Sequence, residues 1–320
     1  MVAGTETGCQ DEECLMENTQ RSYRDGNDQQ LMFALARRYP ADHLRVVDLP
    51  YRLSSWALDD PENARLWFDP DGALLAWAVL QTPFWTIDIT CRPDAAPALY
   101  AEILAWADVR ARQAVNTFYG HPAWYVMVFA DQVLLIRELE RAGFASQTNI
   151  GEDSWSKVFM RRPGGLPVKD YRIPPGFTVR SLAGEAEVGA YVDLHRDVFQ
   201  TKNMTVEWRQ RTLKQPDYHP DLEVVVAAPD GRLAAFCIAW LHGKNGQIEP
   251  LGCHADYRRY ALGRVALAEA LRRLQAAGVE QIYVETDNYR DTAMKLYEHM
   301  GFEGFRQVWV YRKDYGSPER

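Results

Sequence analysis

Residues 248–302 decide the fold, and they read IEPLGCHADYRRYALGRVALAEALRRLQAAGVEQIYVETDNYRDTAMKLYEHMGF. This stretch predicts a strand, an arginine-rich turn, a helix from Gly263, a strand over Gln281–Thr286, and a helix that stops at Gly301-Phe302. A helix that follows a strand through such a turn presents free backbone N–H groups and the positive end of its dipole. That arrangement suits a pyrophosphate, so the turn is where we expect the chemistry.

The surrounding pattern indicates the fold class. The first helix places Leu267, Leu271 and Leu274 on one face and stops before Gly278, and residues 305–311 alternate like a half-buried strand. Strands and helices in this order predict an α+β protein in which a mixed β-sheet is flanked by helices.

Three pairs of residues recur at a spacing of 158 or 159 positions: Arg21-Ser22 and Arg180-Ser181, Asp71-Gly72 and Asp230-Gly231, and Gly143-Phe144 and Gly301-Phe302. The Asp-Gly pairs predict hairpin turns and the Gly-Phe pairs predict helix ends, so the markers fall at equivalent structural points. Two tandem copies of one fold are therefore expected. The predicted boundaries are a disordered tail over 1–20, an N-terminal copy over 21–162, a linker over 163–176 and a C-terminal copy over 177–315.

The length, charge and cysteine content of the chain exclude several classes of partner and cofactor. A chain of 320 residues suits two domains, and its net charge of −8 argues against nucleic acid as a partner. No apolar run is long enough for a membrane span, which predicts a cytoplasmic protein without a membrane partner. Five scattered cysteines do not make a disulfide framework, and no group of residues has metal-ligand spacing, so no metal is predicted.

Residues 177–313 resemble the GNAT acyltransferase superfamily, and the C-terminal copy is the better match. The family's turn, Arg/Gln-x-x-Gly-x-Gly/Ala, is present as Arg258-Arg259-Tyr260-Ala261-Leu262-Gly263. Its later elements are present as Asn288, Ala293, Leu296-Tyr297 and Gly301-Phe302. Ala261 stands where the family has glycine, a departure that suits a negative backbone φ and conflicts with a positive one.

The resemblance implies two tandem GNAT-like domains, each with a partly splayed sheet, and acetyl-CoA as the acyl-donor cosubstrate. The family's pantetheine arm pairs with the strand before the turn, and its pyrophosphate lies on the turn amides with arginines nearby. Asn288 is expected either to cap the following helix or to contact the pantetheine arm. The implied donor-binding residues are Leu251, Gly252, Cys253, Arg258, Arg259, Tyr260, Ala261, Leu262, Gly263, Arg264, Val265 and Asn288.

The resemblance also implies direct transfer of an acetyl group to a primary amine of a small molecule within a ternary complex. Glu249 is the candidate general base, and an ordinary strand-edge carboxylate is its alternative. Tyr297 takes the position of the family's proton donor to the leaving thiolate, with a core aromatic as its alternative. Glu207, Trp208 and Trp240 are candidates for holding the acceptor by charge and ring face.

The N-terminal copy differs from the C-terminal copy both at the turn and at the position of the tyrosine. Its counterpart of the turn, residues 90–97, has no glycine and contains two prolines, and Leu139 replaces the tyrosine. We therefore expect one working site, with the N-terminal copy packed against it as an intramolecular pseudo-dimer in a monomer or homodimer. Two alternatives stay open: a non-catalytic acyl-CoA-binding regulatory module, and an acetyltransferase like mycothiol synthase, a tandem member of the family.

Overall fold

The computed structural model describes residues 18–117 and 120–316. The predicted tail over 1–20 therefore lies outside the described residues up to position 17. Its last two residues, Thr19 and Gln20, already belong to the first strand. The expectation of disorder is thus wrong for these two residues, because Thr19 and Gln20 pair with Phe68 and Trp67.

The two halves of the chain repeat one series of strands and helices. The N-terminal half contains β1 (Thr19–Ser22), α1 (Gly26–Arg38), α2 (Leu49–Leu53), β2 (Ala64–Phe68), β3 (Leu74–Gln81), β4 (Thr86–Cys91), α3 (Ala96–Ala114), β5 (Ala123–Phe129), α4 (Val133–Arg141), β6 (Ala145–Ser146) and β7 (Ser156–Pro163). The C-terminal half contains β8 (Thr178–Ser181), α5 (Val188–Phe199), α6 (Val206–Leu213), β9 (Glu223–Ala227), β10 (Leu233–His242), β11 (Asn245–Cys253), α7 (Leu262–Ala276), β12 (Gln281–Asp287), α8 (Asp291–His299) and β13 (Glu303–Asp314).

The predicted repeat is visible in the hydrogen bonds. Arg21 forms two hydrogen bonds of 2.6 Å to Asp28, seven residues later. Arg180 does the same with Glu187, at 2.7 and 2.6 Å. Each acceptor also takes a backbone N–H three residues after its arginine. The paired glycines of the turns and helix ends all have positive φ, between 81° and 85°, a conformation that favours glycine.

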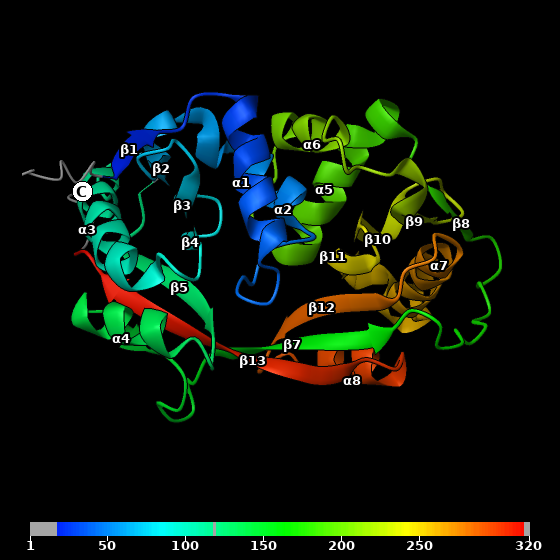
Figure 1. The fold of residues 1–320 in the computed structure, drawn as a ribbon. Helices are drawn as coiled ribbons and strands as arrows, with labels where there is room; N and C mark the ends of the chain where they lie inside the picture. Colours follow the sequence, from blue (N-terminus) through cyan, green and yellow to red (C-terminus); the bar gives the residue numbers. More distant parts are fainter. Residues whose placement is uncertain (1–17, 118–119, 317–320) are drawn as a thin grey trace, which may run out of the picture.

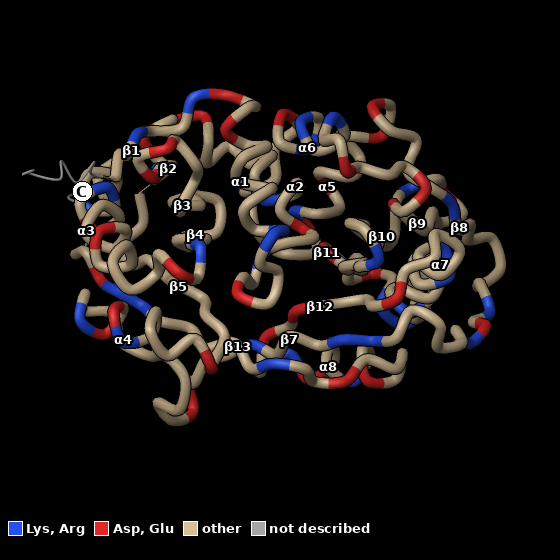
Figure 2. The backbone as a smooth tube through the Cα atoms, viewed as in Figure 1, with Lys and Arg blue, Asp and Glu red and all other residues tan. Residues whose placement is uncertain are grey.

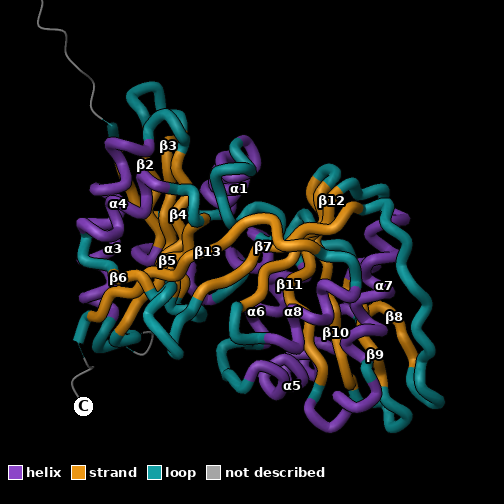
Figure 3. Tube along the Cα trace, turned by 90° about the horizontal axis from the view of Figure 1, so that it is seen from below, coloured by secondary structure: helices purple, strands orange, loops and turns teal. Residues whose placement is uncertain are grey.

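One continuous sheet joins the halves (Figure 1), in the order β1-β2-β3-β4-β5-β13-β7-β12-β11-β10-β9-β8, with β6 beside β13. The last strand of each half lies in the sheet of the other. β13 pairs with β5, and β7 pairs with β12. Figure 3 shows these two strands crossing the middle of the molecule. The strand exchange makes each half depend on the other for a complete sheet.

Each half has its own apolar core, and a third cluster seals the seam. In the C-terminal half α7 packs Leu267, Leu271 and Leu274 against the sheet, as the periodicity predicted. The third cluster joins Tyr51 of α2 to Trp208 and other buried side chains of the C-terminal half. Basic and acidic residues are mixed along both halves (Figure 2). Within the described residues, no helix has the length and apolar character of a membrane span.

Candidate active site

The two strands that frame the candidate site diverge. β11 and β12 pair in parallel from Asn245 opposite Gln281 as far as Gln247 opposite Tyr283, and then separate although both continue. The register between β10 and β11 also shifts opposite Glu249 and Pro250, so β11 is irregular where it leaves β12. Parallel strands that separate in this way leave backbone groups of β11 unpaired by β12.

Gly252 lies in this diverging part of β11. A Cβ atom placed there would approach Phe236 Cζ and Val198 Cγ1 to 2.6 Å, closer than real contacts allow. Cys253 follows, and burial raises the pKa of its thiol. A thiol that keeps its proton is a weak nucleophile, so Cys253 is not a candidate nucleophile. The segment Leu251–Cys253 therefore matters for its backbone edge, which faces the gap to β12.

The arginine-rich turn leads into α7 as predicted. A short 3₁₀ segment over Ala255–Tyr260 precedes Ala261, and α7 begins at Leu262 with no side-chain cap. Among the described residues, the amide of Leu262 has no backbone acceptor, whereas the amide of Gly263 bonds the Cys253 thiol. The start of α7 therefore presents the Leu262 amide at the positive end of its dipole, and the Gly263 amide beside the end of β11.

Three arginines surround this helix start without a carboxylate partner among the residues the structure describes. Arg258 and Arg259 are exposed. Arg259 lies over the Tyr260 ring, and Arg264 lies 5.6 Å from the Tyr171 ring centroid. Cations that are not already neutralised are suited to phosphate oxygens.

Ala261 is the departure from the family's turn, and its backbone has φ of 55° and ψ of 29°. This left-handed conformation costs a residue with a Cβ roughly 1–2 kcal/mol, whereas glycine adopts it readily. The sequence left the sign of φ at Ala261 open, and the structure shows the positive φ, which is unfavourable for alanine.

We expect Ala261→Gly to raise the free energy of unfolding by about 0.5–1 kcal/mol. Relief of the left-handed strain exceeds the extra chain entropy that glycine adds to the unfolded state. Denaturant titration measures the difference. Ala190→Gly, at an exposed position inside α5, is the control and should lower stability by about 1 kcal/mol. A destabilised Ala261→Gly protein would contradict the strain.

Glu249 is half-buried at the point where β11 leaves β12. Burial raises its pKa from 4.5 to about 7, the negative charges of Asp48 and Glu285 add to the rise, and Arg45 and Lys157 oppose it. A carboxylate with this pKa exchanges protons at neutral pH, as a general base must. The strand-edge alternative is less apt, because an exposed carboxylate would keep its ordinary pKa.

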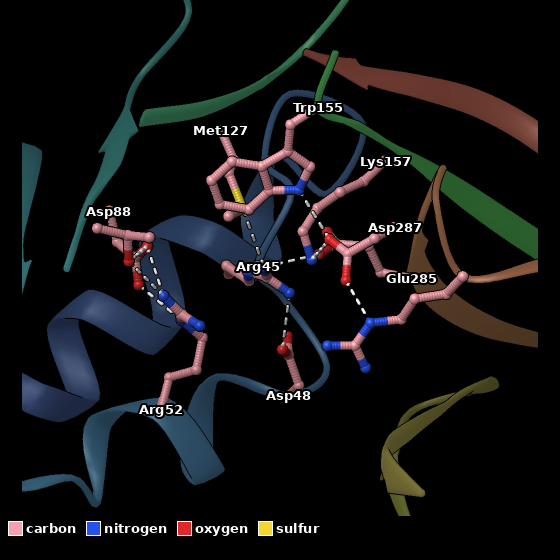
Figure 4. Close-up of polar contacts among 11 residues, drawn as sticks. Arg45, Asp48, Arg52, Asp88, Met127, Trp155, Lys157, Glu285 and Asp287 are labelled. Carbon is pink, nitrogen blue, oxygen red and sulfur yellow. Dashed lines mark hydrogen bonds and ion pairs between the residues drawn. The ribbon is translucent and has the colours of Figure 1, made fainter. Parts of the chain in front are cut away.

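A buried cluster of charges faces Glu249 from both halves. Arg45 bonds Asp48 at 3.3 Å and Glu285 at 3.1 Å, and Lys157 bonds Glu285 at 2.7 Å and Asp287 at 3.3 Å. Figure 4 shows Arg45 at the centre of this group. Burial alone would raise the pKa of Glu285, but Arg45 and Lys157 outweigh it and lower the value to about 2.

No motif in the sequence pointed to four charged residues of this cluster: Arg45, Asp48, Lys157 and Glu285. Arg45 and Asp48 lie in a loop of the other copy, so neither periodicity nor a family motif points to them. One signal was available for Glu285. It stands two residues beyond Tyr283, and Glu249 two beyond Gln247, at equivalent places on the parallel strands.

Tyr297 lies on α8 and is 7% exposed, packed in the C-terminal core with its ring 5.8 Å from that of Phe302. Its hydroxyl has no hydrogen-bond partner in the described part of the chain. Burial raises the pKa of this phenol, and Cys237 and Glu249 act in the same direction. The hydroxyl therefore keeps its proton at neutral pH, and packing and proton donation are compatible roles.

Asn288 does not cap the following helix, and that expectation is wrong. α8 begins at Asp291 with Arg290 at its cap. The Asn288 side chain instead accepts from the Ser156 amide at 3.1 Å and donates to the Ser154 carbonyl at 3.2 Å. It thereby ties the end of β12 to the segment that enters β7.

The three acceptor candidates do not form one group. Glu207 is exposed in the first turn of α6, whereas Trp208 and Trp240 are each 1% exposed. The Trp208 ring stacks on Tyr51 at 5.2 Å, and the Trp240 indole donates to the Glu249 carbonyl at 2.7 Å. Trp240 therefore holds the backbone of the candidate base in place. Glu207 lies at the surface, whereas both indole rings are buried, so the three residues do not line one pocket.

The corresponding helix start of the N-terminal half has its groups already bonded. Arg92 pairs with Asp94 at 2.7 Å and Asp69 at 3.5 Å, and its carbonyl takes the amides of Ala95 and Ala96. Leu139, the counterpart of Tyr297, is a fully buried core residue.

The diverging strands of the N-terminal half are also occupied. β4 and β5 share a single pair, Thr86 opposite Tyr125. Residues 42–45 line the space beyond it together with residues 88–90 and 126–127, and a cavity of about 30 Å³ remains. Gln132 anchors this segment by donating to the Asp42 carbonyl at 2.7 Å. The chain itself thus fills the space between the diverging strands of the N-terminal half.

Part of the sequence is similar to known acetyltransferases. Residues 189–302 match the acetyltransferase (GNAT) family. The mycothiol acetyltransferase of Kineococcus radiotolerans is 33% identical over 133 residues, 40% of this chain and 43% of that protein. The mycothiol acetyltransferase of Thermobispora bispora is 24% identical over 164 residues, 48% of this chain and 56% of that protein. The chain spans about half the length of these curated relatives.

Solved structures match over nearly the whole chain. A GCN5-related N-acetyltransferase from Sphaerobacter thermophilus has a TM-score of 0.64 at 18% identity and covers 94% of this chain and 97% of its own. A tandem GNAT protein from the clavulanic acid biosynthesis pathway has a TM-score of 0.63 at 11% identity, with 95% and 99% covered. At these identities the match concerns the fold. Residues 189–302 thus match the acetyltransferase (GNAT) family, within a chain that has the fold of tandem GNAT proteins.

Proposed function

We propose that the protein transfers an acetyl group from acetyl-CoA to a primary amine of a small molecule, at one site in the C-terminal half. The observation that carries this proposal is a carboxylate with a near-neutral pKa, Glu249, at the mouth of two diverging strands and close in sequence to an uncapped, arginine-lined helix start. A general base and a phosphate site in this order are what transfer from a CoA thioester needs.

In the proposed reaction Glu249 accepts a proton from the acceptor's ammonium group, directly or through a water. The freed amine nitrogen then forms a bond to the thioester carbonyl carbon, and the carbon–sulfur bond breaks. Tyr297 donates its proton to the departing thiolate, and the new amide nitrogen loses its remaining extra proton, which returns to Tyr297 through solvent. The products are a neutral amide and CoA thiol, with the first proton on Glu249. The acceptor and acetyl-CoA are both bound during the transfer, with no acyl group on the protein.

The donor would lie along Leu251–Cys253 and on the start of α7. Leu251–Cys253 would pair with the pantetheine arm, and the amides of residues 259–265 with the pyrophosphate. Arg258, Arg259 and Arg264 would add charge-assisted hydrogen bonds to phosphate oxygens. Asn288 lies at the end of β12, where contact with the pantetheine arm is its remaining proposed role.

Residues 21–162 would serve as the partner copy and residues 177–315 as the catalytic copy, with 163–176 between them. A mycothiol-synthase-like acceptor is the second candidate, because proteins called mycothiol acetyltransferase match this chain. A non-catalytic acyl-CoA-binding module is the third.

Thiol release from acetyl-CoA, measured over a panel of primary amines, tests the proposal. We expect release that depends on the amine, and a higher melting temperature in the presence of acetyl-CoA alone. A raised melting temperature with no release from any amine would favour the non-catalytic module. If acetyl-CoA neither raised the melting temperature nor released thiol, the proposed donor binding would be contradicted.

We expect Arg258→Ala combined with Arg259→Ala to weaken acetyl-CoA binding by at least about a hundredfold. Hydrogen bonds to charged groups contribute roughly 1.5–3 kcal/mol, and two phosphate contacts would be lost. Calorimetry measures the dissociation constant. Arg272→Ala is the matched control, since Arg272 lies on α7 but pairs with Asp170. Binding within twofold of wild type in the double variant would contradict the phosphate role.

A further inference from the structure

The charged cluster connects β12, one of the two strands that frame the candidate site, to a loop of the other half. It runs without a break from Asp48 through Arg45 to Glu285 and on through Lys157 to Asp287, with each link between 2.7 and 3.3 Å. Asp48 and Arg45 precede α2 of the N-terminal half, and Glu285 and Asp287 belong to β12 of the C-terminal half.

Strand geometry brings the two glutamates to the same side of the sheet. Gln247 opposite Tyr283 is the last parallel pair, and Glu249 and Glu285 each stand two residues further on. Side chains two residues apart on a strand point to one face. Glu249 and Glu285 therefore flank the opening between β11 and β12, as two carboxylates in different ionisation states.

Arg45 and Lys157 account for the state of Glu285. Both cations bond its Oε1 atom, and its side chain is 3% exposed. Held in this way, Glu285 is a permanent anion and cannot serve as the base. Arg45 is shared between Glu285 and Asp48, and its charge only partly offsets the rise in the pKa of Glu249.

Asp48 directly precedes α2, which lies beside Glu249: the ring of Tyr51 in α2 is 6.5 Å from the ring of Trp240, and the Trp240 indole donates to the Glu249 carbonyl. Asp48 is 0% exposed, and its backbone carbonyl accepts the amides of Tyr51 and Arg52 at the start of α2. One carboxylate oxygen meets Arg45, and the other, Oδ1, has no hydrogen-bond partner among the described residues. The negative charge of Asp48 raises the pKa of Glu249. Burial also raises the pKa of Asp48 itself, while Arg45 and Arg52 favour its ionised form.

We infer that the N-terminal half completes the catalytic site, with Asp48 as a positioning residue that keeps a second negative charge beside Glu249. Arg45 of the same loop holds Glu285 as the fixed anion. The inference rests on the acetyltransferase function proposed above, and it gives the copy without a donor site a chemical role.

The other groups that act on Glu249 hold one charge state through the neutral range. Burial raises the pKa values of the nearby tyrosines, so they stay neutral, and Glu285 stays ionised. The charged or titratable groups involved are Arg45, Asp48, Tyr51, Lys157, Tyr191, Glu285 and Tyr297. A change in the titration of Glu249 after replacement of Asp48 can therefore be assigned to Asp48.

The test is the pH profile of kcat/KM, measured with acetyl-CoA and the same amine for every variant, so that the titration of the amine cancels. Asp48→Asn removes a negative charge, which makes Glu249 easier to ionise. We expect the midpoint of the acidic limb to move down by about one pH unit. The KM for acetyl-CoA and the melting shift it causes should stay within twofold of wild type.

Two further variants separate charge from structure. Asp48→Glu keeps the charge and should keep the wild-type midpoint, even if Asp48→Asn is too unstable for a full profile. Asp88→Asn is the matched control, because both of its oxygens are already bonded to Arg52 and it does not act directly on Glu249. It should leave the midpoint in place.

An unmoved midpoint in Asp48→Asn, a moved one in Asp48→Glu, or equal shifts in Asp48→Asn and Asp88→Asn would overturn the inference. In those cases thiol release by the wild type would leave the proposed function standing. Absence of thiol release from wild-type protein with every amine would overturn both.

Discussion

Replacing Glu249 with glutamine should lower kcat/KM for acetyl transfer about a hundredfold to ten-thousandfold, the usual contribution of a general base. Glutamine has the same shape but cannot accept the proton of the acceptor's ammonium group. Steady-state thiol release measures the loss. The melting shift with acetyl-CoA should persist, since the donor-binding turn is untouched. Glu280→Gln, at an exposed position before β12, should retain full activity.

The same substitution should change stability in a direction that depends on pH. The pKa of Glu249 rises from 4.5 to about 7 on folding, so the folded state favours the protonated carboxyl. The stability it contributes is present below pH 4.5 and is lost as pH rises through 7. Glutamine stays neutral, so Glu249→Gln should be more stable than wild type at pH 8, by about 3 kcal/mol, and within about 1 kcal/mol of wild type at pH 5.

Unchanged thiol release in Glu249→Gln would remove Glu249 from the mechanism. Equal melting temperatures of wild type and variant at pH 8 would show that the carboxyl is not held near neutrality.

Replacing Glu285 with glutamine should lower the free energy of unfolding by about 3 kcal/mol at pH 7, because two buried cations lose their shared anion. These cations, Arg45 and Lys157, come from the N-terminal half, so the loss falls on the seam between the copies. Denaturant titration measures the difference. Glu269→Gln is the control: Glu269 pairs with Arg272 and Arg273 but is 30% exposed, and such pairs contribute at most about 1 kcal/mol.

The effect should fade in acid. The pKa of Glu285 falls from 4.5 to about 2 on folding, so its stabilisation is present above pH 4.5 and is lost as pH falls from there to about 2. Two to three pKa units correspond to about 3 kcal/mol, in agreement with the expected cost of the substitution. A variant as stable as wild type at pH 7, or a difference that persists below pH 2, would contradict the pairing.

The sequence predicted the parts of the fold that depend on local pattern. The turn into α7, the helix end at Gly301 and the repeated hairpins each follow from a few neighbouring residues, and all are present. Ala261 stood out in the sequence as the departure from the family's turn. The sign of its φ could not be predicted, because alanine usually has a negative φ and takes a positive one only where the surrounding turn imposes it.

The strand exchange could not be predicted from pattern. β7 and β13 have similar alternation, and either could complete either half of the sheet, so the choice depends on contacts between distant segments. The seam cluster has the same origin, since Arg45 and Glu285 are 240 residues apart in sequence. The capping role expected of Asn288 failed because the residue bonds across the sheet to Ser154 and Ser156.

The central claim is a single working donor site in the C-terminal half, and the stoichiometry of acetyl-CoA binding tests it most directly. Titration calorimetry of the wild-type chain should give one acetyl-CoA per chain. Binding should be weakened by the Arg258→Ala/Arg259→Ala double substitution and unaffected by Arg92→Ala in the N-terminal half. Two molecules per chain, none, or a single one that is lost with Arg92 would contradict the account.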